Sequence, residues 1–209
     1  MKIRKYREIE NIASSASDGT IFVVAGPDLY QMGRLCNTVI DRFRKSMDYE
    51  IFRYTGDSLV EGDLKKYILE NSLFSSGKLI IISNAHKLGK ASVLELFDAI
   101  ERGLSDSAIF LTSEKVPGGS SLLRKLEKAV PVYTCYEPFD SDMPEWARKL
   151  ASEENIKLKR DTVQLLIEYS GRNLRRLADA VTKLAIYYGP GAVVDRNCMI
   201  EVILGKGGS

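Results

Sequence analysis

The chain contains little of the chemistry on which common enzyme classes depend. It has one histidine, His86, and three widely separated cysteines, Cys36, Cys135 and Cys198. A lone histidine with no cysteine or serine at a recognisable spacing does not indicate a metal site or a catalytic triad, so we expect His86 to lie at the surface or to cap a helix. An odd number of cysteines in apolar surroundings suits a reducing compartment better than a disulfide framework.

Long apolar runs and a strong charge of either sign are also missing. No stretch approaches the length needed to cross a membrane, and the basic start of the chain lacks the apolar segment of a secretory signal. With 30 basic and 28 acidic residues the formal net charge is +2, so composition alone does not indicate nucleic-acid binding. We therefore expect a soluble, cytoplasmic protein that does not bind a membrane.

Apolar, β-branched runs alternate with helical patterns over the first two thirds of the chain. Each run is bounded by turn residues and followed by a segment with apolar residues at helical spacing. The predicted strands cover residues 20–25, 49–54, 78–83, 107–112 and 130–135, and the predicted helices cover 59–69, 91–104 and 120–128, with another starting after Asp28. Five strands alternating with helices predict an α/β domain whose mostly parallel sheet is covered by helices on both faces.

The pattern changes after residue 138. From residue 143 onward only helical patterns are found, and the clearest helix has Asn173 as its N-cap and ends before Gly189. We therefore predict an α/β domain over residues 1–138, a small all-α domain over 139–204 and a flexible tail over 205–209.

The first predicted strand ends where a phosphate-binding loop would begin, but most of the residues of such a loop are missing. A P-loop has the pattern G-x-x-x-x-G-K-[ST], in which backbone N–H groups surround the phosphates and the lysine neutralises them. Gly26 supplies the first glycine, whereas Gln31 stands in place of the second glycine and Met32 in place of the lysine. Asp28 would bring negative charge near the phosphates, and we expect it to cap the following helix instead.

The acidic pair that holds Mg²⁺ in nucleotide-driven enzymes is missing as well. The third predicted strand is followed by Ser83-Asn84-Ala85-His86. The sequence therefore predicts the architecture of a nucleotide-driven protein without a cofactor, a metal or catalytic residues.

Leu73 and Phe74 form a bulky apolar pair among small polar residues, just before a strand that reads as buried. Inserted into a pocket of another protein, they would contribute roughly 1.5–3 kcal/mol each, and anchors of this kind often dominate an interface. The alternative is that both side chains pack under the edge of their own sheet.

Four segments together resemble the delta subunits of the bacterial DNA polymerase III clamp loader. They are residues 24–30 at the emptied loop, 71–82 before and within the third strand, 136–139 with Trp146, and 171–178 in the predicted helical domain. Their order and spacing extend over most of the chain. The resemblance implies an AAA+-like, P-loop-type α/β domain followed by a helical lid, in a DNA-replication protein that does not hydrolyse ATP and has no catalytic site of its own.

In that family the delta subunit binds and opens the ring-shaped sliding clamp (beta) by inserting an apolar pair into a pocket on the clamp. Leu73 and Phe74 are the matching residues here. The implied partners are the sliding clamp, the ATPase subunits and delta prime of the loader, and primed DNA. Family members also carry a third, helical collar domain, which we expect to be absent from this chain.

The predicted lid is rich in basic residues. Arg175 lies where active AAA+ relatives have an arginine that senses the nucleotide, and clamp loaders surround primed DNA. Arg172, Arg175 and Arg176 are therefore candidate contacts to DNA or phosphate. The alternative is a solvated helical face on which nearby acids such as Asp179 cancel the charge.

Two other functions are open at this point. One is a divergent NTPase of the P-loop fold that uses an unrecognised loop, and the other is a generic DNA-binding or adaptor module of the same fold.

Overall fold

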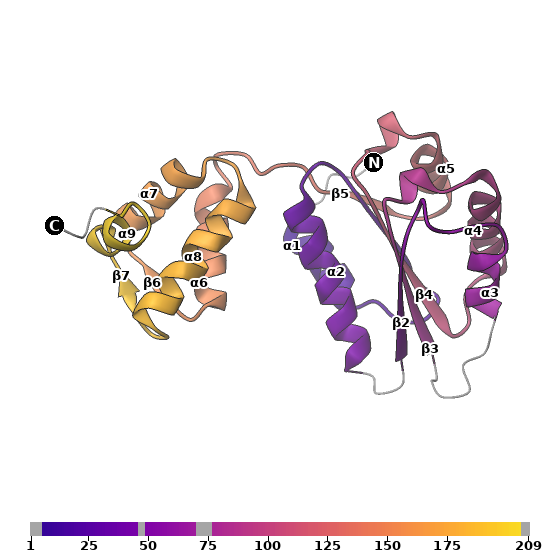
Figure 1. The fold of residues 1–209 in the computed structure, drawn as a ribbon, viewed down its shortest axis with the longest axis horizontal. Coiled ribbons are helices and arrows are strands. Elements are labelled where there is room, and N and C mark those ends of the chain that lie inside the picture. The colour runs from indigo at the N-terminus through magenta and orange to yellow at the C-terminus, as the bar shows by residue number, and fades with distance from the viewer. Residues whose placement is uncertain (1–5, 46–48, 70–76, 206–209) are drawn as a thin grey trace. The chain divides into compact units, whose positions relative to one another are not determined.

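The computed structural model describes residues 6–45, 49–69 and 77–205. These residues belong to two compact units, of which the first ends at Tyr136 and the second begins at Glu137 (Figure 1). Within the described ranges, no helix is long and apolar enough to span a membrane.

A five-stranded sheet forms the centre of the first unit, with all neighbouring strands parallel. Its strand order is β2-β3-β4-β1-β5. The strands are β1 Ile21–Ala25, β2 Tyr49–Thr55, β3 Gly77–Ser83, β4 Ser107–Ser113 and β5 Val132–Thr134. The five predicted strands and their parallel pairing are confirmed, although β5 is shorter than expected.

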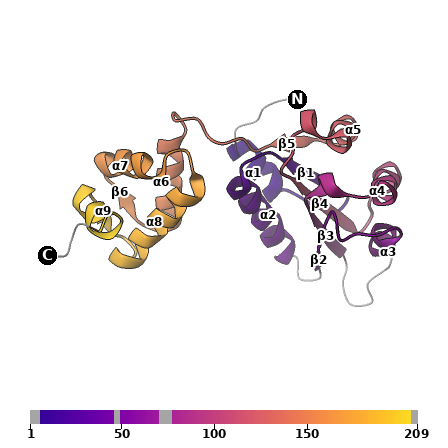
Figure 2. The same cartoon turned by 45° about the horizontal axis from the view of Figure 1, so that its top comes forward.

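Helices cover both faces of this sheet, as predicted (Figures 1 and 2). Phe22, Val24 and Phe110 point to one face and pack with α1 and α2, whereas Val23 and Leu111 point to the other face and pack with α3, α4 and α5. This alternation follows from the two-residue period of a strand and explains why β1, β3 and β4 have apolar residues at consecutive positions. The helices are α1 Tyr6–Ser14, α2 Leu29–Arg44, α3 Asp63–Leu69, α4 Lys90–Arg102 and α5 Ser121–Ala129, with short 3₁₀ turns at Ala85–Lys87 and Pro117–Gly119.

Helix α1 was not predicted from the sequence, and α3 begins later than expected. Gly62, with a φ of +91°, ends the turn that precedes α3. The Asp63 carboxylate accepts a hydrogen bond from the Val60 N–H at 3.0 Å. The Asp63 N–H also donates to the Val60 carbonyl oxygen at 3.2 Å, so residues 60–62 form a turn that precedes the helix.

The second unit is built mainly from four described helices: α6 Met143–Glu153, α7 Arg160–Ser170, α8 Leu174–Tyr188 and α9 Arg196–Val202. Asn173 caps α8 by accepting a hydrogen bond from the Arg176 N–H at 2.9 Å, which confirms the predicted N-cap. The expectation of helices alone is corrected by one small feature, because β6 (Lys157–Leu158) pairs in parallel with β7 (Val193–Val194).

Candidate functional site

The loop between β1 and α2 lies at the carboxyl edge of the parallel sheet, where ligands of α/β proteins usually bind. Gly26 follows β1 with a φ of +140°, and a Cβ atom there would clash with the Cys135 carbonyl group, so only glycine fits. The Gly26 N–H donates to the Ser113 carbonyl oxygen at 2.8 Å, and the Asp28 N–H donates to the Cys135 carbonyl oxygen at 3.3 Å. Both N–H groups are thus used by the protein's own carbonyl groups.

Asp28 and Gln31 form a buried polar pair at the start of α2. Asp28 Oδ1 accepts a hydrogen bond from the Gln31 backbone N–H at 2.9 Å, which confirms the predicted N-cap. Gln31 Nε2 donates to Asp28 Oδ2 at 3.0 Å and to the Tyr136 carbonyl oxygen at 2.7 Å. Only 8% of Asp28 and 5% of Gln31 are exposed. A phosphate at this helix terminus would therefore meet the buried Asp28 carboxylate.

Met32 and Cys135, which lie near this pair, supply neither a cation nor a reactive thiol. Met32, which stands in place of the P-loop lysine, is buried in the core with Leu35. Burial raises the pKa of the adjacent Cys135 thiol to about 12, and the Asp28 carboxylate adds to this effect. The thiol is therefore neutral at physiological pH and is a poor nucleophile.

His86 belongs to a hydrogen-bond network at the same edge of the sheet. Its Nδ1 lies 3.1 Å from Ser113 Oγ, which donates to the Lys115 carbonyl oxygen at 2.9 Å and accepts from the Lys115 N–H at 3.1 Å. Because the hydroxyl proton is directed to a carbonyl oxygen, this arrangement favours an N–H at Nδ1 that donates to Ser113 Oγ. Partial burial, followed by the charge of Lys115, lowers the pKa of His86. The histidine is partly exposed, in keeping with the expected surface position, and it is bonded to Ser113.

The residues after β3 also show no metal-binding arrangement. Asn84 adopts a left-handed conformation with a φ of +53°, which asparagine tolerates better than most residues, and its carbonyl oxygen accepts from the Lys87 N–H at 2.8 Å. In the part of the chain that the structure describes, no three acidic, histidine or cysteine side chains are grouped so that they could hold a metal ion.

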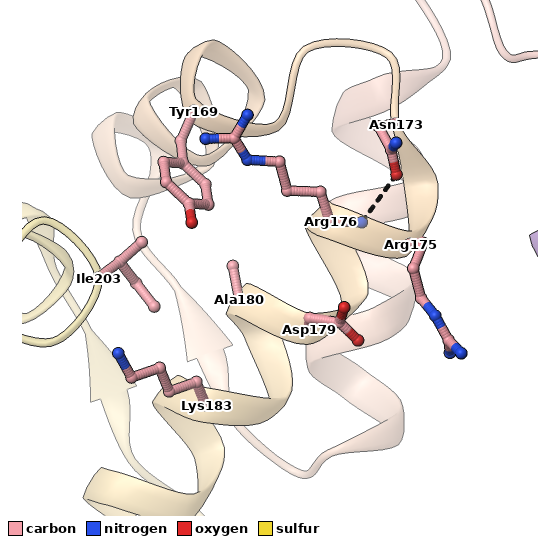
Figure 3. Close-up of a pocket in the computed structure, with 8 residues that line it drawn as sticks. All are labelled: Tyr169, Asn173, Arg175, Arg176, Asp179, Ala180, Lys183 and Ile203. Carbon is pink, nitrogen blue, oxygen red and sulfur yellow. Dashed lines mark hydrogen bonds between the residues drawn. The ribbon is translucent and has the colours of Figure 1, made fainter.

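The three lid arginines of the sequence analysis do not form a single cluster. Arg172 Nε donates to the Pro138 carbonyl oxygen at 2.8 Å, and its guanidinium lies 6.0 Å from the centre of the Phe139 ring. Arg175 and Arg176 both line a surface hollow of about 310 Å³ in the second unit, together with Tyr169, Asn173, Asp179, Ala180, Lys183 and Ile203 (Figure 3). The structure therefore brings two of the three arginines to one site. Arg172 instead contacts Pro138 and Phe139 near the start of the second unit.

The predicted clamp-binding residues, Leu73 and Phe74, lie outside the described residues, between α3 and β3. Lys78, of which 7% is exposed, donates from Nζ to the Tyr67 carbonyl oxygen at 3.0 Å. This bond satisfies one of the carbonyl groups that the end of α3 leaves without a helical partner. The end of α3 is thereby held against the start of β3.

Two features of these sites were missed by the sequence analysis. The Asp28–Gln31 pair follows the spacing of a capping box, in which an N-cap residue is followed three positions later by Glu or Gln, so its signal was present. The contact of Arg176 with Tyr169 joins two different helices, and no local pattern indicates it.

Sequence comparison finds no matching family model and no matching curated protein. Structural comparison finds a DNA clamp loader delta protein from Bacillus subtilis, with a TM-score of 0.69 and 12% identity over 95% of this chain. It also finds the RuvB Holliday junction branch migration motor of Thermotoga maritima, with a TM-score of 0.63 and 15% identity over 96% of this chain. This chain spans 62% of the length of the first protein and 68% of the second.

The fold is AAA+-like. At these identities the comparisons establish the fold alone. In this AAA+-like fold the loop after β1 is the place where a nucleotide-binding member would hold phosphate, and here that place contains the buried Asp28–Gln31 pair.

Proposed function

We propose that this chain is a non-catalytic clamp-loader subunit, equivalent to the delta subunit of DNA polymerase III, which binds and opens the sliding clamp during DNA replication. The likeness to the Bacillus subtilis clamp loader delta protein supports this proposal at the level of fold. The protein would act in the cytoplasm as an accessory subunit rather than as an enzyme.

The observation that carries the proposal is the filled phosphate loop. A protein that used ATP at this loop would need available N–H groups and a cation. Here the Asp28 carboxylate and the Gln31 amide are bonded to each other and to the main chain, and Met32 is buried in the core. A subunit that takes its energy from partner ATPases requires no working loop of its own.

Leu73 and Phe74 are the residues we propose for clamp binding. Lys78 supports this assignment indirectly, because its bond to the Tyr67 carbonyl oxygen fixes the end of α3 before residues 70–76. The two anchors would supply several kcal/mol toward opening a ring interface.

The partners we propose are the sliding clamp (beta), the ATPase subunits and delta prime of the loader, and primed DNA. Arg172, Arg175 and Arg176 remain our candidates for contacts to DNA or phosphate, and the exposure of Arg175 and Arg176 is compatible with such contacts.

Capture of the sliding clamp from the same organism tests the proposal. The immobilised chain should retain the purified clamp without ATP, because the proposed contact needs no nucleotide. Calorimetric titration of the chain with ATP should give no heat of binding at micromolar concentrations. Clamp capture that fails would contradict the proposal, and micromolar ATP binding by the chain alone would support the divergent NTPase.

A further inference from the structure

The hollow in the second unit is formed by the end of α7, one face of α8 and the residue that follows α9 (Figure 3). Its volume is about 310 Å³. Ala180 is buried, and its small side chain forms the floor. Tyr169 borders the hollow from α7 and Ile203 borders it from the end of α9.

Two cations lie along the same face of α8, on either side of this floor. Arg176, Ala180 and Lys183 have the i, i+4, i+7 spacing of one helical stripe, and at 1.5 Å per residue the two cationic positions are about 10 Å apart along the helix. In Figure 3, Arg176 reaches toward Tyr169 and Lys183 extends toward Ile203. The two charges are therefore arranged in a row and do not converge on a single point.

Arg176 is held in position before any ligand arrives. Its guanidinium carbon lies 4.2 Å from the centre of the Tyr169 ring, which is within the range of a cation–π contact. A guanidinium placed on a ring still has N–H groups at its edges that can donate to phosphate oxygens. The start of α8 adds a partial positive charge close to Arg176.

The balance of charge around the hollow is positive. Its lining includes three cationic residues, Arg175, Arg176 and Lys183, and one acidic residue, Asp179. Figure 3 shows Arg175 projecting away from Tyr169, so Arg176 and Lys183 are the cations that face the floor. An anionic ligand with more than one charged group matches this arrangement better than a single small anion.

We infer that this hollow binds phosphate groups of a polyanionic ligand, with Arg176 and Lys183 contacting two different phosphates. A nucleic-acid strand fits best, since its phosphates form a row, as do the two cations. The inference rests on the nucleic-acid part of the proposed function and deepens it, because it adds Lys183 and Tyr169 to the contact that Arg176 makes.

Fluorescence anisotropy with a labelled single-stranded oligonucleotide, measured over a range of salt concentrations with the full chain, tests this inference. Arg176→Ala and Lys183→Ala should each weaken binding about two- to fivefold, as expected for exposed charge contacts. Each should also reduce the slope of log Kd against the logarithm of the salt concentration by about 0.7. This is the value for one phosphate contact on a single strand.

Arg160→Gln is the matched control, since Arg160 is an exposed cation at the opposite end of α7 from Tyr169, about 13 Å away along the helix. It should change neither the affinity nor the salt slope. Circular dichroism should show that all three variants keep the wild-type melting temperature within a few degrees.

A parallel titration with ATP and with pyrophosphate separates the two sources of phosphate. Loss of oligonucleotide binding in Arg176→Ala and Lys183→Ala supports a strand, and loss of ATP or pyrophosphate binding alone supports a free phosphate compound. If neither variant differs from Arg160→Gln with any of these ligands, the inference is wrong. Both variants should capture the clamp like the wild-type chain. If the wild-type chain itself does not capture the clamp, the proposed clamp binding fails, whatever the result with the oligonucleotide.

Discussion

Asp28 uses both of its carboxylate oxygens at the start of α2, one on a backbone N–H and one on the Gln31 side chain. Asp28→Ala removes the cap and leaves the buried Gln31 amide with a single partner, so it should lower the free energy of unfolding by about 1–2 kcal/mol. Urea denaturation measures this loss. Asp41→Ala, an exposed position on the same helix, should change stability by less than about 0.5 kcal/mol, and an equal loss in both variants would contradict the assigned role.

Protonation of His86 makes the free energy of unfolding depend on pH. Partial burial places the pKa of His86 in the folded chain below the usual histidine value of 6.5, so between these two values the unfolded chain binds more protons. The free energy of unfolding therefore rises with pH in this window, and the stability is lost as the pH falls from about 6.5 through the folded pKa.

The titration of this histidine can be followed directly, because the chain has no other. Its imidazole proton resonances should titrate with a midpoint below 6.5 in the folded protein. Between about pH 7.5 and 5, His86→Gln should lose less stability than the wild type. A folded midpoint at or above 6.5 would show that burial and Lys115 do not control this group.

At the scale of elements, the end of α3 depends on one buried lysine. Lys78→Met keeps the aliphatic stem but removes the bond to the Tyr67 carbonyl oxygen, so it should cost about 1.5–3 kcal/mol, as expected for a hydrogen bond to a charged group. Hydrogen exchange should accelerate most in the last turn of α3. Lys65→Met, at an exposed site on the same helix, is the control, and equal exchange rates in both variants would exclude this role.

The strands could be predicted because each is a mainly apolar run bounded by turn residues, and β1, β3 and β4 are buried on both faces of the sheet. Their order could not, because every parallel strand with a crossover helix has the same local pattern. Contacts such as β1 with β4, where Phe22 lies opposite Phe110, depend on which strands become neighbours, and this is decided by packing of the whole unit.

The two short strands of the second unit and helix α1 were missed for different reasons. β6 and β7 have two residues each, too few for a period-two pattern. Helix α1 has Ile9 and Ala13 buried at helical spacing, but its nine residues are fewer than the window over which helical periodicity stands out. At the site, Asp28 could be predicted as a cap from its position before a helix, whereas the bond from Gln31 to the Tyr136 carbonyl oxygen spans 105 residues.

At the scale of the molecule, the chain combines an AAA+-like α/β unit, whose phosphate loop is filled by its own side chains, with a helical unit that carries a basic hollow. The central claim of this account is that it binds the sliding clamp through Leu73 and Phe74.

The most direct test is the clamp affinity of the Leu73→Ala/Phe74→Ala double variant, measured by biolayer interferometry. Removing two anchors worth roughly 1.5–3 kcal/mol each should weaken binding at least about a hundredfold, while the melting temperature stays within a few degrees of wild type. The matched control is Val60→Ala/Leu94→Ala, which truncates two apolar residues of the same unit that are 64% and 71% exposed, and it should bind the clamp like the wild type. Clamp binding that survives in the double variant, or a chain that unfolds because the pair belongs to its core, would contradict the account.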